Sequence, residues 1–357
     1  MTLVRITHYR PVLAVAQSVA QSVAQSGNSV NRRLRALALC LLPCLLPCLL
    51  LLHTAAMAQD AAFPSRPIRI VAPFGAGGGG DTSLRMLGTH LAKALGQPVV
   101  VDNKPGANGV IGAQEALRST PDGYTLFYGS TTTLAANVSV MKKLPYDPGK
   151  DFVAVTLVSG IPFMLVVHPT LPVNTVAQLV ALAKSSRPAL SFASANHTGL
   201  VAGSAFARLA GVELLHVPYK ASPAALTDLV GGQVSMMFVD VAAGLQLVKA
   251  GKLRVIGVTA ASRSALLPGV PAIAEALPGY EIVGWTAMMA PAGTRPEVVR
   301  RIQQEVEKIL VQPEVRAEFE RVGFEPRTAT PEETEAFIRA ERDKWAQRVK
   351  AAGIEPE

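Results

Sequence analysis

Residues 67–81 read PIRIVAPFGAGGGGD and predict a buried strand, a glycine-rich loop and the start of a helix. The run before Pro73 is apolar, and four leucines between residues 84 and 95 then recur at the spacing of one helix face. A strand that leads into a helix through glycines places backbone N–H groups at the positive end of that helix. The stretch therefore predicts an α/β fold with an anion-binding loop that needs no lysine or arginine.

The alternation of short apolar runs with amphipathic stretches continues along the chain. Further strands are predicted at residues 98–102, 124–128, 163–168, 190–193, 214–217, 235–239 and 254–258, and helices at 81–95, at 108–119 and from near residues 174, 199, 222 and 242. Two charged helices follow, ending near Gln312 and Ala352. This rhythm predicts parallel sheets covered by helices, and two α/β units fit the chain better than one sheet of ten strands.

Two turn-rich segments, residues 160–162 and 278–280, are the best candidates for passages between the two units. They divide the chain into a discontinuous first domain, residues 59–161 plus 280–357, and a second domain, residues 162–279. A double passage makes a hinge, and a hinge between two α/β lobes makes a cleft for a ligand.

Residues 1–58 predict an export leader. An arginine-rich stretch, residues 32–35, precedes an apolar core at 36–52, and Ala56-Met57-Ala58 follows as a small-residue exit. This order is typical of a secretory signal, so we expect cleavage after Ala58 and a periplasmic protein. A transmembrane anchor is the alternative, but the core has only about 17 residues and contains two prolines.

The leader also holds all three cysteines and much of the net charge. Without Cys40, Cys44 and Cys48, the mature chain has no thiol chemistry, disulfide or cysteine-bound metal. Five arginines and no acidic residue lie in the leader, which leaves 29 basic against 26 acidic residues in the remainder. This near balance predicts no nucleic-acid partner. The leader is unusually long, and a start site assigned too far upstream, within residues 1–31, explains its length.

The glycine loop matches the dinucleotide fingerprint through Gly75, Gly77 and Gly80, with Asp102 at the end of the next strand. Four consecutive glycines satisfy almost any glycine pattern, and Pro73-Phe74 places a rigid, bulky pair where the phosphate turn should begin. We therefore expect no nicotinamide and no other cofactor. The usual motifs of serine hydrolases, zinc proteases and P-loop proteins are missing, and the histidines lack metal-ligand spacing, so no catalytic or metal site is predicted.

A second strand–loop–helix segment, residues 190–199, offers neutral donors at another helix start. Its candidate ligand contacts are Ser194, Asn196, Thr198 and Gly199. Two helix N-termini that face one cleft from two lobes would clamp a small carboxylate. The alternative interpretation is turn and cap chemistry alone, and for Asp81 the alternative to ligand binding is a role as the N-cap of the first helix.

Motifs in a fixed order along residues 63–355 resemble one family. They are the loop Pro73–Asp81, Asn103-Lys-Pro-Gly-Ala-Asn-Gly109, Pro121-Asp-Gly-Tyr-Thr-Leu126, His216-Val-Pro-Tyr-Lys220, Leu229-Val-Gly-Gly-Gln-Val234, Ala250-Gly-Lys-Leu-Arg254, Pro268-Gly-Val-Pro271 and Ala290-Pro-Ala-Gly293. The chain resembles the Bug family, the periplasmic solute-binding receptors of tripartite tricarboxylate transporters.

The resemblance implies a hinged, two-lobe, type II periplasmic-binding-protein-like fold that closes on a small organic carboxylate held by main-chain groups and water. Carried over by position, the ligand contacts are Phe74, Ala76, Gly77, Gly78, Asp81, Ser130 and Thr131 in one lobe and Ser194, Asn196, Thr198, Gly199 and Asp240 in the other. Two departures add bulk beside the cleft, namely Asn196-His-Thr198 without the family's second glycine and Ala221-Ser-Pro223 after Lys220.

The function expected from this resemblance is a monomeric, non-enzymatic receptor that delivers its ligand to membrane permease subunits. One alternative is a periplasmic sensor that presents its closed form to a signalling protein. The other is an exported enzyme that uses the same cleft, although the sequence offers no nucleophile–base pair for it.

Overall fold

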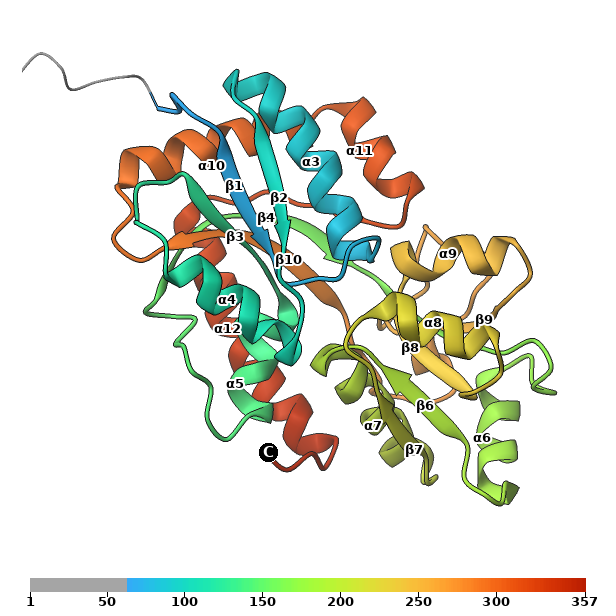
Figure 1. The fold of residues 1–357 in the computed structure, drawn as a ribbon. Helices are drawn as coiled ribbons and strands as arrows, with labels where there is room; N and C mark the ends of the chain where they lie inside the picture. The colour runs from blue at the N-terminus through green and yellow to red at the C-terminus, as the bar shows by residue number, and fades with distance from the viewer. Residues whose placement is uncertain (1–62) are drawn as a thin grey trace, which may run out of the picture. The chain divides into compact units, whose positions relative to one another are not determined.

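The computed structural model describes residues 63–357. The predicted leader (1–58), its apolar core (36–52) and the cleavage site after Ala58 lie outside the described residues. Within residues 63–357, no helix has both the length and the apolar character needed to cross a membrane. Residues 64–357 form one unit that contains two β-sheets, and helices cover both sheets (Figure 1).

The first sheet contains the strand of the opening stretch, β1 (Ile68–Ala72). Its six strands follow the order β11-β4-β10-β3-β1-β2, with β2 at Val99–Asn103, β3 at Thr125–Ser130, β4 at Phe152–Ile161, β10 at Gly284–Pro291 and β11 at Glu325–Pro326. β1 runs parallel to β2 and β3, with Ile68 opposite Val99 and Arg69 opposite Thr125. β4 is antiparallel to β10 and β11, and β10 is also antiparallel to β3, so the prediction of a wholly parallel sheet is wrong.

The two longest strands of this sheet, β4 and β10, were not predicted. Nearly every residue of both strands is buried, so neither shows the alternation of apolar and polar residues that marks a half-exposed strand. The predicted turn at 160–162 is mostly strand, because Gly160 and Ile161 belong to β4.

Helices cover both faces of the first sheet (Figure 1). They are α3 (Gly79–Leu95), α4 (Val110–Leu117), α10 (Pro296–Leu310), α11 (Pro313–Arg321) and α12 (Pro331–Ala351), with the short turns η1 (Ala107–Gly109), η2 (Thr132–Ala136) and α5 (Asn137–Val140). The four leucines of α3 are buried, as their spacing predicts. α12 starts with a reciprocal cap between Thr330 and Glu333 and packs against β4 and η2.

The second sheet has five strands in the order β7-β6-β8-β5-β9. They are β5 (Phe163–Val167), β6 (Ser191–Ser194), β7 (Leu215–Pro218), β8 (Met236–Asp240) and β9 (Arg254–Val258), and the accompanying helices are α6 (Val176–Ser185), α7 (His197–Ala210), α8 (Ser222–Val230) and α9 (Val241–Lys249). β6 is parallel to β7 and β8, whereas β5 is antiparallel to β8 and β9. All five strands were predicted to within one residue at each end.

The chain passes twice between the sheets. Pro162 alone separates β4 from β5, and residues 259–283, which include η3 (Ile273–Glu275), connect β9 back to β10. Thr259 holds these connections side by side, since its hydroxyl shares its one hydrogen between the carbonyl oxygens of Ile282 (2.6 Å) and Phe163 (3.1 Å). We call residues 63–161 with 284–357 the first lobe and residues 163–258 the second lobe. The predicted domain boundaries, after residues 161 and 279, fall at the first passage and within the second.

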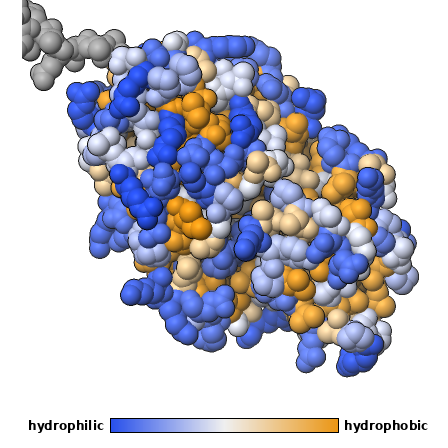
Figure 2. All heavy atoms as spheres, in the orientation of Figure 1, coloured by the Kyte–Doolittle hydropathy of each residue, from blue (hydrophilic) through white to orange (hydrophobic). Residues whose placement is uncertain are grey.

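The surface is mixed in character. On the face shown in Figure 2, hydrophobic residues form small patches separated by hydrophilic ones. The large exposed hydrophobic side chains lie on different elements, and they are Val100, Ile111, Val138, Leu209, Leu215 and Val311. Val100 lies on β2, an edge strand of the first sheet, where it is half exposed.

Candidate functional site

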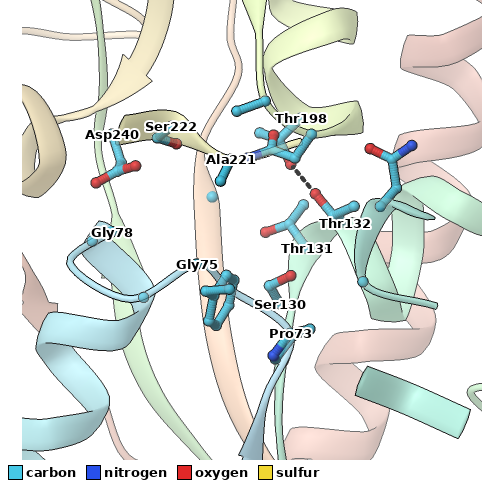
Figure 3. A pocket seen from close by; sticks show the side chains of 18 of the residues that line it. Pro73, Gly75, Gly78, Ser130, Thr131, Thr132, Thr198, Ala221, Ser222 and Asp240 are labelled. Carbon is cyan, nitrogen blue, oxygen red and sulfur yellow. Dashed lines mark hydrogen bonds between the residues drawn. The ribbon is translucent and has the colours of Figure 1, made fainter. Parts of the chain in front are cut away.

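A cavity lies between the two lobes, at the carboxyl ends of β1, β3, β6 and β8. Its volume is about 80 Å³, several times the roughly 10–15 Å³ that a cavity needs to hold one water. Figure 3 shows loop residues of the first lobe facing those of the second across it. The carboxyl ends of strands are the usual ligand position in open α/β sheets.

The helix α3 begins at this cavity without a side-chain cap. Its N-cap is Gly78, whose own N–H donates to the carbonyl oxygen of Gly75 (3.1 Å). The N–H groups of a first helical turn have no partner within their helix, and here Gly79 and Gly80 supply two of them at the cavity wall. The positive end of α3 is therefore open to an anion.

Asp81 is not the N-cap of α3, and that prediction is wrong. Its carboxylate turns back over the loop, where it accepts hydrogen bonds from Gly77 N (2.9 Å), Asn103 Nδ2 (2.8 Å) and Arg85 Nε (3.0 Å). Burial acts to raise the pKa of the Asp81 carboxyl, but these hydrogen bonds outweigh it and hold the pKa below its ordinary value. The ionised Asp81 carboxylate thus holds the glycine loop in place, and it does not line the cavity.

Phe74 occupies the space beside the consecutive glycines. A Cβ on Gly80 would lie 2.6 Å from the Phe74 ring, which also makes an edge contact with Tyr128 at 6.1 Å between centroids. The glycine at position 80 therefore allows the Phe74 ring to pack closely against α3.

Asp102, the acidic residue of the match to the dinucleotide fingerprint, is paired with Arg69 (3.0 Å) and Lys104 (3.4 Å).

The end of β3 and the start of η2 place hydroxyl groups along one side of the cavity. The Thr131 hydroxyl is engaged with β10, because it accepts from Trp285 N (2.7 Å) and donates to Trp285 O (3.2 Å). Thr132 reaches the second lobe, with its Oγ1 3.1 Å from Thr198 Oγ1 (Figure 3). Within residues 63–357 the Ser130 hydroxyl has no hydrogen-bond partner, which leaves it available to a ligand.

Two helices of the second lobe also begin at the cavity. Asn196 caps α7, accepting from Gly199 N at 2.9 Å, so part of the positive end of this helix is already satisfied. α8 begins after Ala221, which provides no side-chain cap, and Ser222 and Pro223 are its first residues. Pro223 has no N–H, so Ser222 supplies the unsatisfied first-turn N–H of α8 at the cavity wall, opposite those of α3 in the other lobe.

Asp240 is the acidic side chain of the cavity wall. It caps α9 through Ala243 N (2.8 Å), and burial raises the pKa of its carboxyl to about 6. Its carboxylate lies against Gly79 of the first lobe, where a Cβ would overlap it. Asp240 therefore caps the N-terminus of α9 and also limits how closely the two lobes approach each other.

Lys220 is the basic side chain among the described residues that line the cavity. It is exposed and makes no hydrogen bond or ion pair within residues 63–357. In the same part of the chain, no group of three or more His, Cys, Asp or Glu side chains is placed to hold a metal ion. Positive potential at the cavity thus comes from helix ends and one peripheral lysine.

The structure divides the predicted contact residues into two groups. Those that line the cavity are Phe74, Gly78, Ser130, Thr131, Asn196, Thr198 and Asp240. Those that lie outside its wall are Ala76, Gly77, Asp81, Ser194 and Gly199. In the second group the polar atoms serve neighbouring loop groups, as with the Ser194 hydroxyl, which lies 2.7 Å from His216 Nε2.

Other cavity residues were not predicted as contacts. They include Asn108, Thr132, Phe163, Ala221, Ser222 and Trp285. For Ser222 a sequence signal existed, because Ala221-Ser-Pro223 departs from the family pattern next to Lys220. Trp285 and Phe163 come from the strands beside the two passages, and no local motif marks them as cavity residues.

Comparison with known proteins gives a family match across most of the chain. The model of the tripartite tricarboxylate transporter family receptor matches residues 84–354. The Bordetella pertussis protein BugT is 35% identical over 304 residues, which cover 84% of this chain and 93% of BugT. The glycine loop, residues 73–81, lies just before the span that the family model matches.

Solved structures agree in fold. The Rhodopseudomonas palustris protein Rpa4515, solved with adipate, superposes with a TM-score of 0.80 at 33% identity and covers 83% of this chain and 100% of its own. MatC from the same organism, solved with bound malate, gives a TM-score of 0.76 at 31% identity, covering 80% of this chain and 100% of MatC. These neighbours confirm the predicted two-lobe fold of periplasmic solute-binding proteins.

Proposed function

Because the chain belongs to the tripartite tricarboxylate transporter receptor family, whose members are periplasmic solute-binding receptors and not enzymes, we propose that it captures a small organic carboxylate between its lobes. The observation that carries this proposal is the pair of uncapped helix starts, α3 and α8, which face one small cavity from opposite lobes. The relatives solved with adipate and with malate support a small dicarboxylate as the kind of ligand.

The cavity can bind such an anion without a central ion pair. A helix end contributes about 0.3–1 kcal/mol when exposed and up to about 2 kcal/mol when partly buried. A neutral donor to a charged acceptor adds about 1.5–3 kcal/mol, and the first-turn N–H groups and Ser130 are such donors. Two helix ends with three or four donors reach the roughly 8.2 kcal/mol of micromolar binding.

Capture works by closure of the two lobes about the paired connections at Pro162 and Thr259. In this proposal the lobes correspond to the discontinuous first domain, 59–161 plus 280–357, and the second domain, 162–279. Thr259 ties the two connections together, and the cavity walls come from both sides of them. The ligand binds only when both uncapped helix ends reach it.

The protein acts outside the cytoplasm as a monomer, after cleavage of its leader behind Ala58, and delivers the carboxylate to membrane permease subunits. The family description supports the permease as partner. Intact mass of the protein recovered from the periplasm tests the cleavage, because the mature chain would begin at Gln59 and lack all three cysteines.

A thermal-shift screen with mono-, di- and tricarboxylates tests the binding function. Ligand at 100 times its dissociation constant stabilises a folded state by about 2.7 kcal/mol, which corresponds to roughly 4 °C in melting temperature for a chain of this size. The diamide of each active diacid is the matched control, since it keeps the shape and removes the charge. Equal shifts by acid and diamide, or no shift across the screen, would refute the proposal.

A further inference from the structure

A buried hydrogen bond joins the two lobes beside the cavity. His197, the first residue of α7 in the second lobe, has its Nδ1 2.8 Å from Oδ1 of Asn137, the first residue of α5 in the first lobe. The exposed fractions are 5% for His197 and 0% for Asn137. Next to this pair, the Thr132 and Thr198 hydroxyls meet at the cavity wall (Figure 3). The bond therefore holds the start of α7 in place one residue from the ligand position.

The other partners of Asn137 decide which atom donates. Its Nδ2 donates to Asn108 O (3.0 Å) and lies 3.5 Å from the hydroxyl of Tyr146, which itself donates to Thr133 O (2.7 Å). Asn137 Oδ1 is thus the acceptor, and His197 Nδ1 carries the hydrogen. A second proton on the ring can only be placed on Nε2.

The surroundings of His197 do not favour that second proton. Of the first-lobe elements that pack near the start of α7, η2 and α5 carry only neutral side chains, whereas α12 carries charged ones, including Arg348 and Lys350 in its last turn. The titratable groups of the immediate surroundings are Tyr146, beside Asn137, and His216 on β7. Glu357 at the C-terminus acts on His216, and within residues 63–357 no carboxylate hydrogen-bonds to His197. Burial lowers the pKa of the His197 ring to about 4, and the neighbouring His216 adds to this.

We propose that His197 is a positioning residue whose buried, neutral ring favours closure of the lobes on the ligand, so that mild acid weakens closure through this residue. The inference rests on the proposed carboxylate-binding function. An exposed imidazole has an ordinary pKa near 6.5, so closure expels a proton from His197 at pH values between about 4 and 6.5. The contribution of His197 to closure is complete above this window and declines as the pH falls through it.

Asp240 acts in the opposite direction. Its carboxyl has a raised pKa of about 6 in the closed structure, so closure takes up a proton there as the pH falls toward the ordinary value of the group. Acid therefore strengthens closure through Asp240 while weakening it through His197. The two effects partly cancel in the unaltered protein, and the difference between variants isolates the histidine.

The test compares His197→Gln with the unaltered protein, using adipate and malate as probes in calorimetric titrations at pH 7.5 and 5.5. Glutamine can donate to Asn137 Oδ1 but cannot take up a proton. We expect the affinity of the unaltered protein, divided by that of the variant, to fall about tenfold between the two pH values. His168→Gln, which alters a partly buried histidine bonded to Thr170 and distant in sequence from the lobe contact, should leave the pH profile unchanged. Parallel profiles for His197→Gln and the unaltered protein would overturn the inference.

A second measurement needs no carboxylate. A variant with both Thr132→Cys and Thr198→Cys, oxidised to a disulfide, would replace the contact between the two hydroxyls by a covalent link and hold the lobes closed. In the crosslinked protein, nuclear magnetic resonance should show the His197 ring titrating well below pH 6. Titration near pH 6.5 would overturn the inference even if adipate and malate bind, whereas failure of both probes to bind contradicts the proposed function alone.

Discussion

The first-lobe loop, Pro73–Asp81, and the second-lobe loop, Ser194–Gly199, share one local plan in which a parallel strand ends and a helix begins at the cavity. They differ in what satisfies the helix. In the second lobe Asn196 caps α7 with its own side chain, whereas in the first lobe Gly78 provides no cap and Asp81 is turned away to bind the loop. The two loops thus offer a ligand different hydrogen-bonding groups: the first offers unsatisfied backbone N–H groups, and the second offers the Thr198 hydroxyl.

Gly79→Ala should produce the largest effect, because it puts a Cβ on the uncapped helix where the lobes meet. The added carbon overlaps the Asp240 carboxylate, which cannot swing freely since it caps α9 through Ala243 N. We expect a loss of carboxylate affinity of at least about 100-fold, or 2.7 kcal/mol, in calorimetric titrations.

Gly88→Ala is the matched control on the same helix. A Cβ there lies 3.4 Å from Val99, an ordinary contact, and alanine favours the helix by about 0.5–1 kcal/mol. Unchanged affinity in both variants would mean that the lobes need not approach as closely as the structure shows.

Gly78→Asp converts the first loop into a copy of the second by supplying the missing cap. Gly78 has an extended backbone (φ −74°, ψ 165°) that accepts a side chain, although its Cβ would lie 3.2 Å from Gly75 O. The new carboxylate should occupy the first-turn N–H groups, raise the free energy of unfolding by up to about 1 kcal/mol and weaken carboxylate binding by roughly 10- to 30-fold. Gly78→Ala adds the same Cβ without a cap, and a loss as large as that of Gly78→Asp would point to steric blockage.

Lys220→Met tests whether a side-chain charge contributes more than the helix ends. Because Lys220 is exposed at the cavity rim, we expect a loss of less than tenfold in affinity, shrinking further at high salt. Lys184→Met, on α6, is the control for an unspecific change in net charge. A hundredfold loss confined to Lys220→Met would show that a direct ion pair holds the ligand.

Asn196→Ala should have the smallest effect on binding, since its side chain serves α7. Removal of the cap should cost about 1 kcal/mol of unfolding free energy in urea denaturation and change carboxylate affinity by no more than about threefold. Thr175→Ala removes the comparable cap of α6, where the hydroxyl accepts from Gln178 N (3.2 Å), and should match it in stability. A tenfold affinity loss for Asn196→Ala alone would place its amide in contact with the ligand.

The strands of the second sheet were predicted as short apolar runs, and α3 was predicted from the spacing of its leucines. β4 and β10 were missed although β5 and β8 are equally buried; polar residues, among them Thr156, Ser159 and Thr286, interrupt the apolar runs of β4 and β10. At the cavity, the glycine loop correctly indicated the open end of a helix. Asp81 was assigned as the N-cap of that helix, because residue spacing does not show the path that the loop takes in three dimensions. Trp285 and the pairing of His197 with Asn137 depend on contacts between distant segments, which a single sequence does not display.

The single-residue link at Pro162 has a mechanical consequence. A connection with no slack, tied by Thr259 to the returning strand, resists sliding of one sheet past the other far more than it resists bending. In the proposed closure the two halves would meet in the same alignment in every cycle, so a backbone N–H group of one helix would return to the same partner without a side chain to guide it. Because this alignment would be reproduced, the backbone N–H groups of glycine residues could recognise a ligand without any side chain that adjusts to it.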